Sequence, residues 1–217
     1  MEYQVYNWYH FCWLSGDNIC EQHIHNIDIA NWIMGDQHPV QANGMGGCTA
    51  RYLGDLKGTG QIFDHHFVEF IYADGTRMYS QCRHMKNCFN SVSEHVHGTK
   101  GYANASGTIG ESEQKITWRF RGKRVSGHQQ EQTDLVADLR AGRRGENEGY
   151  YGANSSMTAV LGRTANYSGK VVKWDELVAK GTSEFPKTLA WDAPAPVQKD
   201  KNGDYPIPMP GVYSPYA

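Results

Sequence analysis

The chain has 217 residues, of which 39% are hydrophobic and 20% are charged, and its formal net charge is −2 at pH 7. This length suits one sizeable globular domain with a buried core. The near-neutral charge gives no reason to expect a nucleic acid or an anionic membrane surface as partner, and no apolar run approaches the roughly 20 residues that a membrane-spanning helix needs.

The first predicted element is a helix over residues Asp17–Met34. It carries one stripe of residues at spacings of three and four, namely Ile24, Ile27, Asn31 and Met34, which is typical of a helix face that packs on a core. Gly35 is a natural helix stop. A Gly-rich segment with a short strand follows, over residues 39–60.

Alternating apolar residues then predict a run of antiparallel strands. Residues 62–85 contain two such runs joined by Asp74-Gly75, a pair that tolerates the backbone angles of a tight hairpin turn. Residues 91–101 and 114–120 supply two further strands. Helical spacing returns over 129–142 and 152–169, and residues 171–180 read as a brief strand that leads into a short helix.

The amino-acid composition changes after Phe185, because seven of the eight prolines lie between Pro186 and Pro215. Proline fixes φ and lacks the backbone donor, so regular structure is not expected there. Trp191, Tyr205 and other large apolar residues favour an extended arm that lies across the domain over a flexible end. We therefore expect a domain over 1–185 and a Pro-rich tail over 186–217. The order of helix, antiparallel strands and helices predicts an α+β fold.

The segment from Glu21 to Asp28 holds the most suggestive titratable groups. On a continuous helix Glu21, His25 and Asp28 fall along one ridge, and a carboxylate one turn before an imidazole can orient it as a base that titrates near neutral pH. The alternative is structural, because Asn18 followed by Glu21 resembles a capping box.

The remaining histidines allow two interpretations. His95 and His97 share a strand face and could meet His66 across neighbouring strands, which would suit a divalent metal site. Hydrogen-bonded or cleft-lining histidines are the alternative. His65 and His66 point to opposite faces of their strand, so they do not ligate one ion together.

Two other clusters are less specific. Trp13 and the aromatic residues before it stand close to Asp17, a combination found in sugar-binding clefts, although plain core packing also explains it. The glycines of residues 43–54 lack the helix that a dinucleotide-binding loop leads into. The five cysteines form no Cys-x-x-Cys pair, so free and mostly buried thiols are expected.

Four motifs together resemble the second, substrate-binding domain of the Gfo/Idh/MocA oxidoreductases, in their bacterial sugar-related branch. They are "NWYHFCWLSGDNICEQHIHNIDIANWIMG", "FDHHFVEFIYADGTRM", "SEHVHGTKG" and "GYYGANSSMTAVLGRTANYSGKVVKWDEL". The resemblance covers residues 3–184. It implies one large, mostly antiparallel open-faced sheet with helices packed on one side, next to a separate Rossmann domain that binds NAD or NADP.

The resemblance also implies roles for single residues. His25 falls on the family's histidine that serves as general acid and base, and Glu21 falls on the carboxylate before it, where aspartate is more common. Asp28 matches an acid that reaches the substrate. His66, His95, His97 and Trp13 are expected to line the cleft.

The expected function is therefore the substrate-binding and oligomerisation domain of an NAD(P)-dependent sugar or polyol oxidoreductase. No Rossmann fingerprint is present and the first residues read like the interior of a longer protein, so no cofactor and no metal is expected on this chain, and whether it is an enzyme by itself stays open. A homo-oligomer formed through the open sheet face is expected. The alternative functions are a non-catalytic binding or assembly module and a metal-dependent sugar lyase or isomerase. The sequence does not decide the compartment; cytoplasm is the default, although relatives are often exported.

Overall fold

The computed structural model describes residues 1–49, 59–143, 145, 147–190 and 192–216. Its contacts divide the chain into two compact units. The first unit comprises residues 1–90 together with 153–217, and the second comprises residues 91–152. Each unit is described by itself.

The first unit begins with short helical segments: α1 (Glu2–Tyr6), η1 (Trp8–His10), α2 (Cys12–Ser15), α3 (Asn18–Glu21) and α4 (Ile24–Ile33). The continuous helix predicted over Asp17–Met34 is thus interrupted between α3 and α4. At the interruption the backbone N–H of His23 donates to the carbonyl oxygen of Asn18, five residues back, at 3.1 Å. Such a wide turn breaks the regular i→i−4 ladder. The predicted stop is confirmed, because Gly35 follows with φ +72°.

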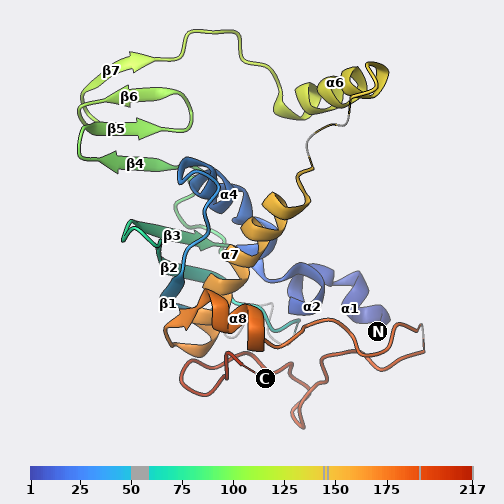
Figure 1. Ribbon diagram of the computed structural model, residues 1–217. Coiled ribbons are helices and arrows are strands. Elements are labelled where there is room, and N and C mark those ends of the chain that lie inside the picture. The colour runs from blue at the N-terminus through green and yellow to red at the C-terminus, as the bar shows by residue number, and fades with distance from the viewer. Residues whose placement is uncertain (50–58, 144, 146, 191, 217) are drawn as a thin grey trace. The chain divides into compact units, whose positions relative to one another are not determined.

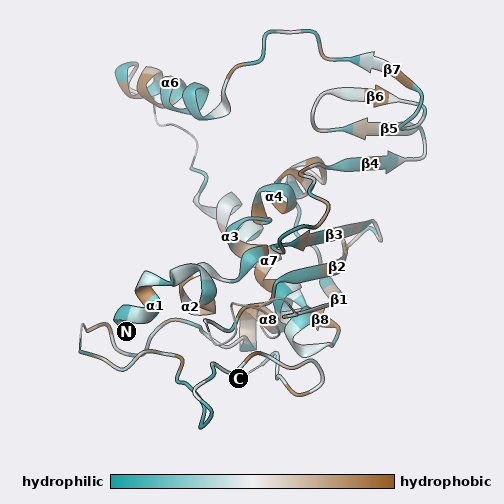
Figure 2. Ribbon diagram, turned by 180° about the vertical axis from the view of Figure 1, so that it is seen from behind, coloured by the Kyte–Doolittle hydropathy of each residue, from teal (hydrophilic) through white to brown (hydrophobic). Residues whose placement is uncertain are grey.

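Four antiparallel strands form the sheet of the first unit in the order β3-β2-β1-β8. Figure 1 labels β1, β2 and β3, and Figure 2 labels β8 as well. They are β1 (Gln41–Gly47), β2 (His65–Ile71), β3 (Arg77–Arg83) and β8 (Val172–Lys173). The predicted hairpin between β2 and β3 is confirmed: Gly75 has φ +86°, and the N–H of Tyr72 donates to the carbonyl oxygen of Thr76 at 2.9 Å.

Helices pack on one face of this sheet and bury the main core. The packed helices are α3, α4, α7 (Gly149–Ser168) and α8 (Trp174–Lys180). The core holds buried residues from these helices and from the strands: Ile19, Ile27, Ala42, Val68, Phe70, Ala159, Leu161, Ala165, Val172, Trp174 and Leu177. On the opposite face Met45 is 72% exposed, Phe67 41% and Tyr79 64%. That face is open.

The second unit contains a separate four-stranded antiparallel sheet in the order β4-β5-β6-β7. Its strands are β4 (His95–Gly98), β5 (Gly101–Asn104), β6 (Thr108–Gly110) and β7 (Ile116–Arg119), and α6 (Gly127–Arg140) follows them. No residue of α6 is buried, and hydrophobic residues stand among its hydrophilic ones in Figure 2. The α+β class with antiparallel strands is confirmed, and the strands are distributed over two sheets.

The Pro-rich tail has several contacts with the start of the chain. Gln4 donates its side-chain amide to the carbonyl oxygen of Val197 at 2.6 Å, and the ring of Tyr205 stacks on Tyr3 with centroids 6.1 Å apart. The N–H of Gly211 donates to the carbonyl oxygen of Ser168 at the end of α7, at 2.8 Å. The boundary at residue 185 stays a prediction. In the part of the chain that is described, no helix has both the length and the apolar character to cross a bilayer.

Candidate functional site

Glu21 and His25 lie on the two sides of the helix interruption. Glu21 ends α3; its side chain is half-buried, and its Oε2 atom is buried with no hydrogen-bond partner among the described residues. His25 lies in the first turn of α4 and is exposed. A carboxylate oxygen removed from water without a partner is unfavourable. Glu21 therefore has an acceptor available, four residues before a histidine that solvent can reach.

Asp28 is tied to the long helix of the first unit. Its Oδ1 atom accepts a hydrogen bond from the hydroxyl of Ser155 in α7, at 2.6 Å. Asp28 is half-buried, and its Oδ2 atom has no hydrogen bond to another residue in the described part of the chain. The bond from Ser155 fixes the carboxylate and leaves one oxygen for another donor.

His66 is placed in the interior instead of on a cleft wall. The residue is 3% exposed. Its Nδ1 atom accepts from the side-chain amide of Asn166 at 2.9 Å, so its Nε2 atom carries the proton that is donated to Oδ1 of Asp17 at 3.1 Å. Both ring nitrogens are used inside the protein, and the predicted contact of His66 with substrate is not retained.

His95 and His97 belong to the second unit and share one face of β4. Nδ1 of His95 lies 2.8 Å from the hydroxyl of Tyr102 and 3.6 Å from a carboxylate oxygen of Glu113. The ring of His97 lies 5.3 Å from that of Tyr102. They form a small exposed cluster within their own sheet, and a role in binding substrate stays a prediction.

Trp13 is half-buried in α2, and its indole N–H donates to the side-chain oxygen of Gln4 at 2.9 Å. The polar end of this ring is therefore used within the N-terminal helices. Its predicted contact with a sugar is untested by this geometry.

A fully buried polar cluster around Asp17 was not anticipated from the sequence. We call Asp17, His66, Asn166 and Tyr167 the Asp17 cluster. The carboxylate of Asp17 accepts from the N–H of Asn18, from His66, from the N–H of Phe63 at 3.0 Å and from the hydroxyl of Tyr167. Asp17 is the N-cap of α3, so the cap is one residue earlier than the predicted Asn18.

Two effects compete for the charge of Asp17. Burial by itself would raise the pKa of this carboxyl, but the interaction with the His66 ring and the hydrogen bonds from His66, Tyr167 and Phe63 hold it below the ordinary value. Burial and the nearby Asp17 charge raise the pKa of Tyr167 well above its ordinary value. Asp17 is therefore ionised and Tyr167 is the neutral donor to it.

Arg163 of α7 contacts the residue just before Asp17. Its Nη1 atom donates to the carbonyl oxygen of Gly16 at 3.1 Å, and its Nη2 atom lies 3.9 Å from a carboxylate oxygen of Glu184. Gly16 and Asp17 both have positive φ angles, +73° and +80°. The same helix thus holds both residues of the turn that leads into α3.

His23 lies at the interruption and points to the sheet. Its Nε2 atom is 2.7 Å from the hydroxyl of Ser80 in β3. Burial, followed by the effect of His66, lowers the pKa of His23 to about 4. His23 is thus a neutral structural residue at neutral pH.

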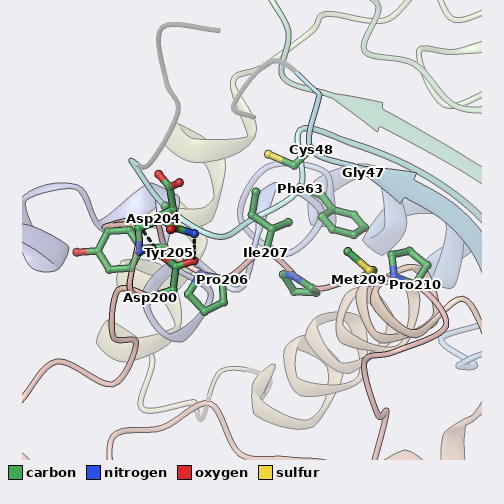
Figure 3. Close-up of a pocket in the computed structure, with 13 residues that line it drawn as sticks. Gly47, Cys48, Phe63, Asp200, Asp204, Tyr205, Pro206, Ile207, Met209 and Pro210 are labelled. Atoms are coloured by element: carbon green, nitrogen blue, oxygen red, sulfur yellow. Dashed lines mark hydrogen bonds between the residues drawn. The ribbon is translucent and has the colours of Figure 1, made fainter. Parts of the chain in front are cut away.

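A cavity of about 460 Å³ lies in the first unit between the end of β1 and the Pro-rich tail (Figure 3). Phe63 and Cys48 face Ile207 and Met209 of the tail in it, and Asp200 and Asp204 lie toward one end. No residue predicted for the site lines this cavity.

The described residues offer little for a metal or a nucleotide. No group of three or more His, Cys, Asp or Glu in that part of the chain is arranged to hold a metal ion, so the metal-dependent alternative gains no support. The glycines of residues 43–47 lie inside β1 instead of in a strand-to-helix loop; residues 50–54 of that cluster lie outside the described residues. A Cβ atom on Gly44 would be 2.3 Å from Oδ1 of Asn166. This glycine therefore serves close packing.

No family model and no curated protein matches the chain. Solved structures do match. A myo-inositol 2-dehydrogenase from Lactobacillus plantarum is 22% identical with a TM-score of 0.54, over 73% of this chain and 49% of that one. A scyllo-inositol dehydrogenase from Lactobacillus casei, solved with NAD(H) and scyllo-inositol, is 17% identical with a TM-score of 0.51, over 70% and 47%.

GenD2 from gentamicin A biosynthesis, solved with NAD, is 18% identical with a TM-score of 0.53, over 76% of this chain and 50% of that one. The chain thus spans about half the length of the solved proteins that it matches. At these identities the likeness shows the fold, and the resemblance inferred from the sequence is confirmed at that level.

Proposed function

We propose that the chain is the substrate-binding part of an NAD(P)-dependent oxidoreductase that acts on a sugar or polyol, with His25 as its proton-transfer residue. One observation carries the proposal: on the fold of half a dehydrogenase, an exposed imidazole lies four residues after a carboxylate whose buried Oε2 has no hydrogen-bond partner among the described residues. Catalytic histidines are commonly oriented by such an acid.

The chemistry assigned to this chain is a proton transfer. When a hydroxyl group is oxidised to a ketone, its proton has to leave as the hydride leaves the carbon, and His25 accepts that proton. Glu21 orients the imidazole, and the free oxygen of Asp28 accepts a hydrogen bond from a second hydroxyl of the substrate. The described glycines of residues 43–47 lie in a strand and form no nucleotide-binding loop, so the proposal places NAD(P) on residues outside this sequence.

The test uses the protein assembled with a nucleotide-binding part, as a longer reading frame or in trans. Reduction of NAD⁺ and NADP⁺ is followed with myo-inositol, scyllo-inositol and a panel of aldoses. We expect His25→Ala to lower kcat by at least about a hundredfold, whereas His128→Ala, an exposed histidine in α6, leaves it unchanged. Equal turnover in the two variants would remove the role given to His25.

A second candidate function is assembly through the open face of the first sheet. Its support is the row of apolar side chains on that face, in which the rings of Phe67 and Tyr79 stack with centroids 6.4 Å apart beside the exposed Met45. An apolar row on an uncovered sheet favours burial against another surface, and we propose that a second copy of the chain supplies it.

Sedimentation or light scattering tests this proposal. Phe67→Glu should shift the protein to a monomer, whereas Val178→Glu, on the exposed side of α8, should not. A wild-type protein that is a strict monomer would exclude self-association through this face.

A further inference from the structure

We propose that Asp17 is a positioning residue, which sets the placement of Glu21 and His25 through the start of α3. The inference rests on the proposed function for its catalytic consequence, but its structural part stands on the Asp17 cluster alone. Nothing in the role given to His25 requires a buried carboxylate eight residues earlier, so the cluster adds a separate element to the site.

The first argument is the conformation of Asp17. Its φ of +80° and ψ of 162° are unusual for a residue with a side chain. Such a conformation persists only where the surroundings determine it more strongly than local preference does. Here they do, because the carboxylate accepts from four donors and the preceding carbonyl oxygen, of Gly16, accepts from Arg163.

The second argument is where these donors come from. Three of them belong to segments distant in the chain: the N–H of Phe63 just before β2, the ring of His66 in β2, and the hydroxyl of Tyr167 at the end of α7. Asn166, next to Tyr167, holds the ring of His66 through its amide. Asp17 is therefore fixed both to the sheet and to α7. The positions of these two elements thus determine where the backbone of the residues after Asp17 begins.

The third argument is the direct link from Asp17 to the candidate catalytic residues. The carbonyl oxygen of Asp17 accepts from the N–H of Cys20 at 2.9 Å and from the N–H of Glu21 at 3.0 Å. Helix α3 has only four residues, too few to hold its own geometry. The anchored Asp17 thus determines the direction in which Glu21 points. It also determines where α4, which carries His25, begins.

A hydrogen-exchange experiment on the chain as it exists tests the structural part. Tyr167→Phe removes one donor to Asp17 and keeps the ring, and Asp17→Asn removes the charge. We expect both variants to speed amide exchange over residues 20–26 on the order of tenfold relative to α8. The matched control is Tyr72→Phe, which removes a comparable buried bond, from the Tyr72 hydroxyl to Oδ1 of Asn31 at 2.8 Å. If exchange over 20–26 does not distinguish Tyr167→Phe from Tyr72→Phe, the positioning role is overturned; should Asp17→Asn fail to fold, Tyr167→Phe decides.

Turnover of the assembled protein tests the catalytic consequence. We expect Tyr167→Phe to lower kcat on the order of tenfold with KM nearly unchanged, and Tyr72→Phe to lower only the thermal midpoint. Faster exchange over 20–26 with no loss of turnover in His25→Ala would refute the proposed function and leave the structural part intact. If exchange is faster and turnover depends on His25, but Tyr167→Phe does not change that turnover, the positioning role is refuted.

Discussion

Gly162 of α7 lies directly against the ring of Phe70 in β2. A Cβ atom at position 162 would be 2.6 Å from Cζ of Phe70 and 3.1 Å from Cδ1 of Ile19. The absence of a side chain at position 162 therefore lets α7 pack on the sheet and, with it, hold the Asp17 cluster.

We expect Gly162→Ala to destabilise the protein by about 1–3 kcal/mol, because overpacking outweighs the better helix propensity of alanine. Gly152→Ala in the same helix is the control, since nothing lies within 4 Å of its Cβ position; it should stabilise by roughly 0.5–1 kcal/mol. Urea unfolding of the two variants measures both values. Equal stabilisation by both alanines would show that the helix is not packed as described.

Asn31 bridges three elements in the interior. Its Oδ1 atom accepts from the hydroxyl of Tyr72, and its amide donates to Oγ1 of Thr158 at 3.0 Å. We expect Asn31→Leu to cost about 1–3 kcal/mol, because it leaves the buried Tyr72 hydroxyl without an acceptor. Adding Tyr72→Phe should recover part of that loss, since both partners are then apolar. A double-mutant cycle by chemical denaturation checks this, and strict additivity would contradict the bond.

His23 gives the stability a specific pH dependence. The folded pKa, about 4, lies below the ordinary 6.5, so below pH 6.5 the unfolded state binds the proton more strongly. The free energy of unfolding should therefore fall as pH drops from about 6.5 to about 4, by up to about 3 kcal/mol. His23→Gln should flatten this part of the curve, and His128→Gln should not. Parallel curves for His23→Gln and the wild type would exclude this assignment.

The thiols should differ in reactivity. Burial raises the pKa of Cys12 and Cys20 to about 12, whereas Cys88 is exposed. We expect a thiol reagent at pH 8 to modify Cys88 rapidly and to reach Cys12 and Cys20 only after unfolding. Peptide mapping after a short exposure measures the modified positions. Early labelling of Cys20 would mean that α3 opens in the native state.

The structural elements that depend on a local pattern of residues were predictable from the sequence. The hairpin at Asp74-Gly75 and the helix end at Gly35 depend on a few neighbouring residues, and both are confirmed. The interruption between Glu21 and Ile24 was not predictable, because it depends on the contact of His23 with Ser80 in a strand 57 residues away.

In the candidate site too, the features with a local sequence signal were predictable and the long-range contacts were not. Glu21 and His25 stood out because an acid and a histidine occur one helical turn apart. His66 also stood out, but its ring is used by Asp17 and Asn166, which lies 100 residues away in the sequence. The one local signal for the Asp17 cluster was an aspartate after a glycine, just before a predicted helix, which is typical of an N-cap. Its long-range partners carry no local signal.

Chemical rescue tests the role of His25 most directly. His25→Ala in the assembled protein is assayed for NAD(P)⁺ reduction with and without added imidazole, and Glu21→Ala is assayed in the same way. The account predicts that imidazole restores part of the turnover of His25→Ala and has no effect on Glu21→Ala. A His25→Ala protein that turns over at the wild-type rate without imidazole would contradict it.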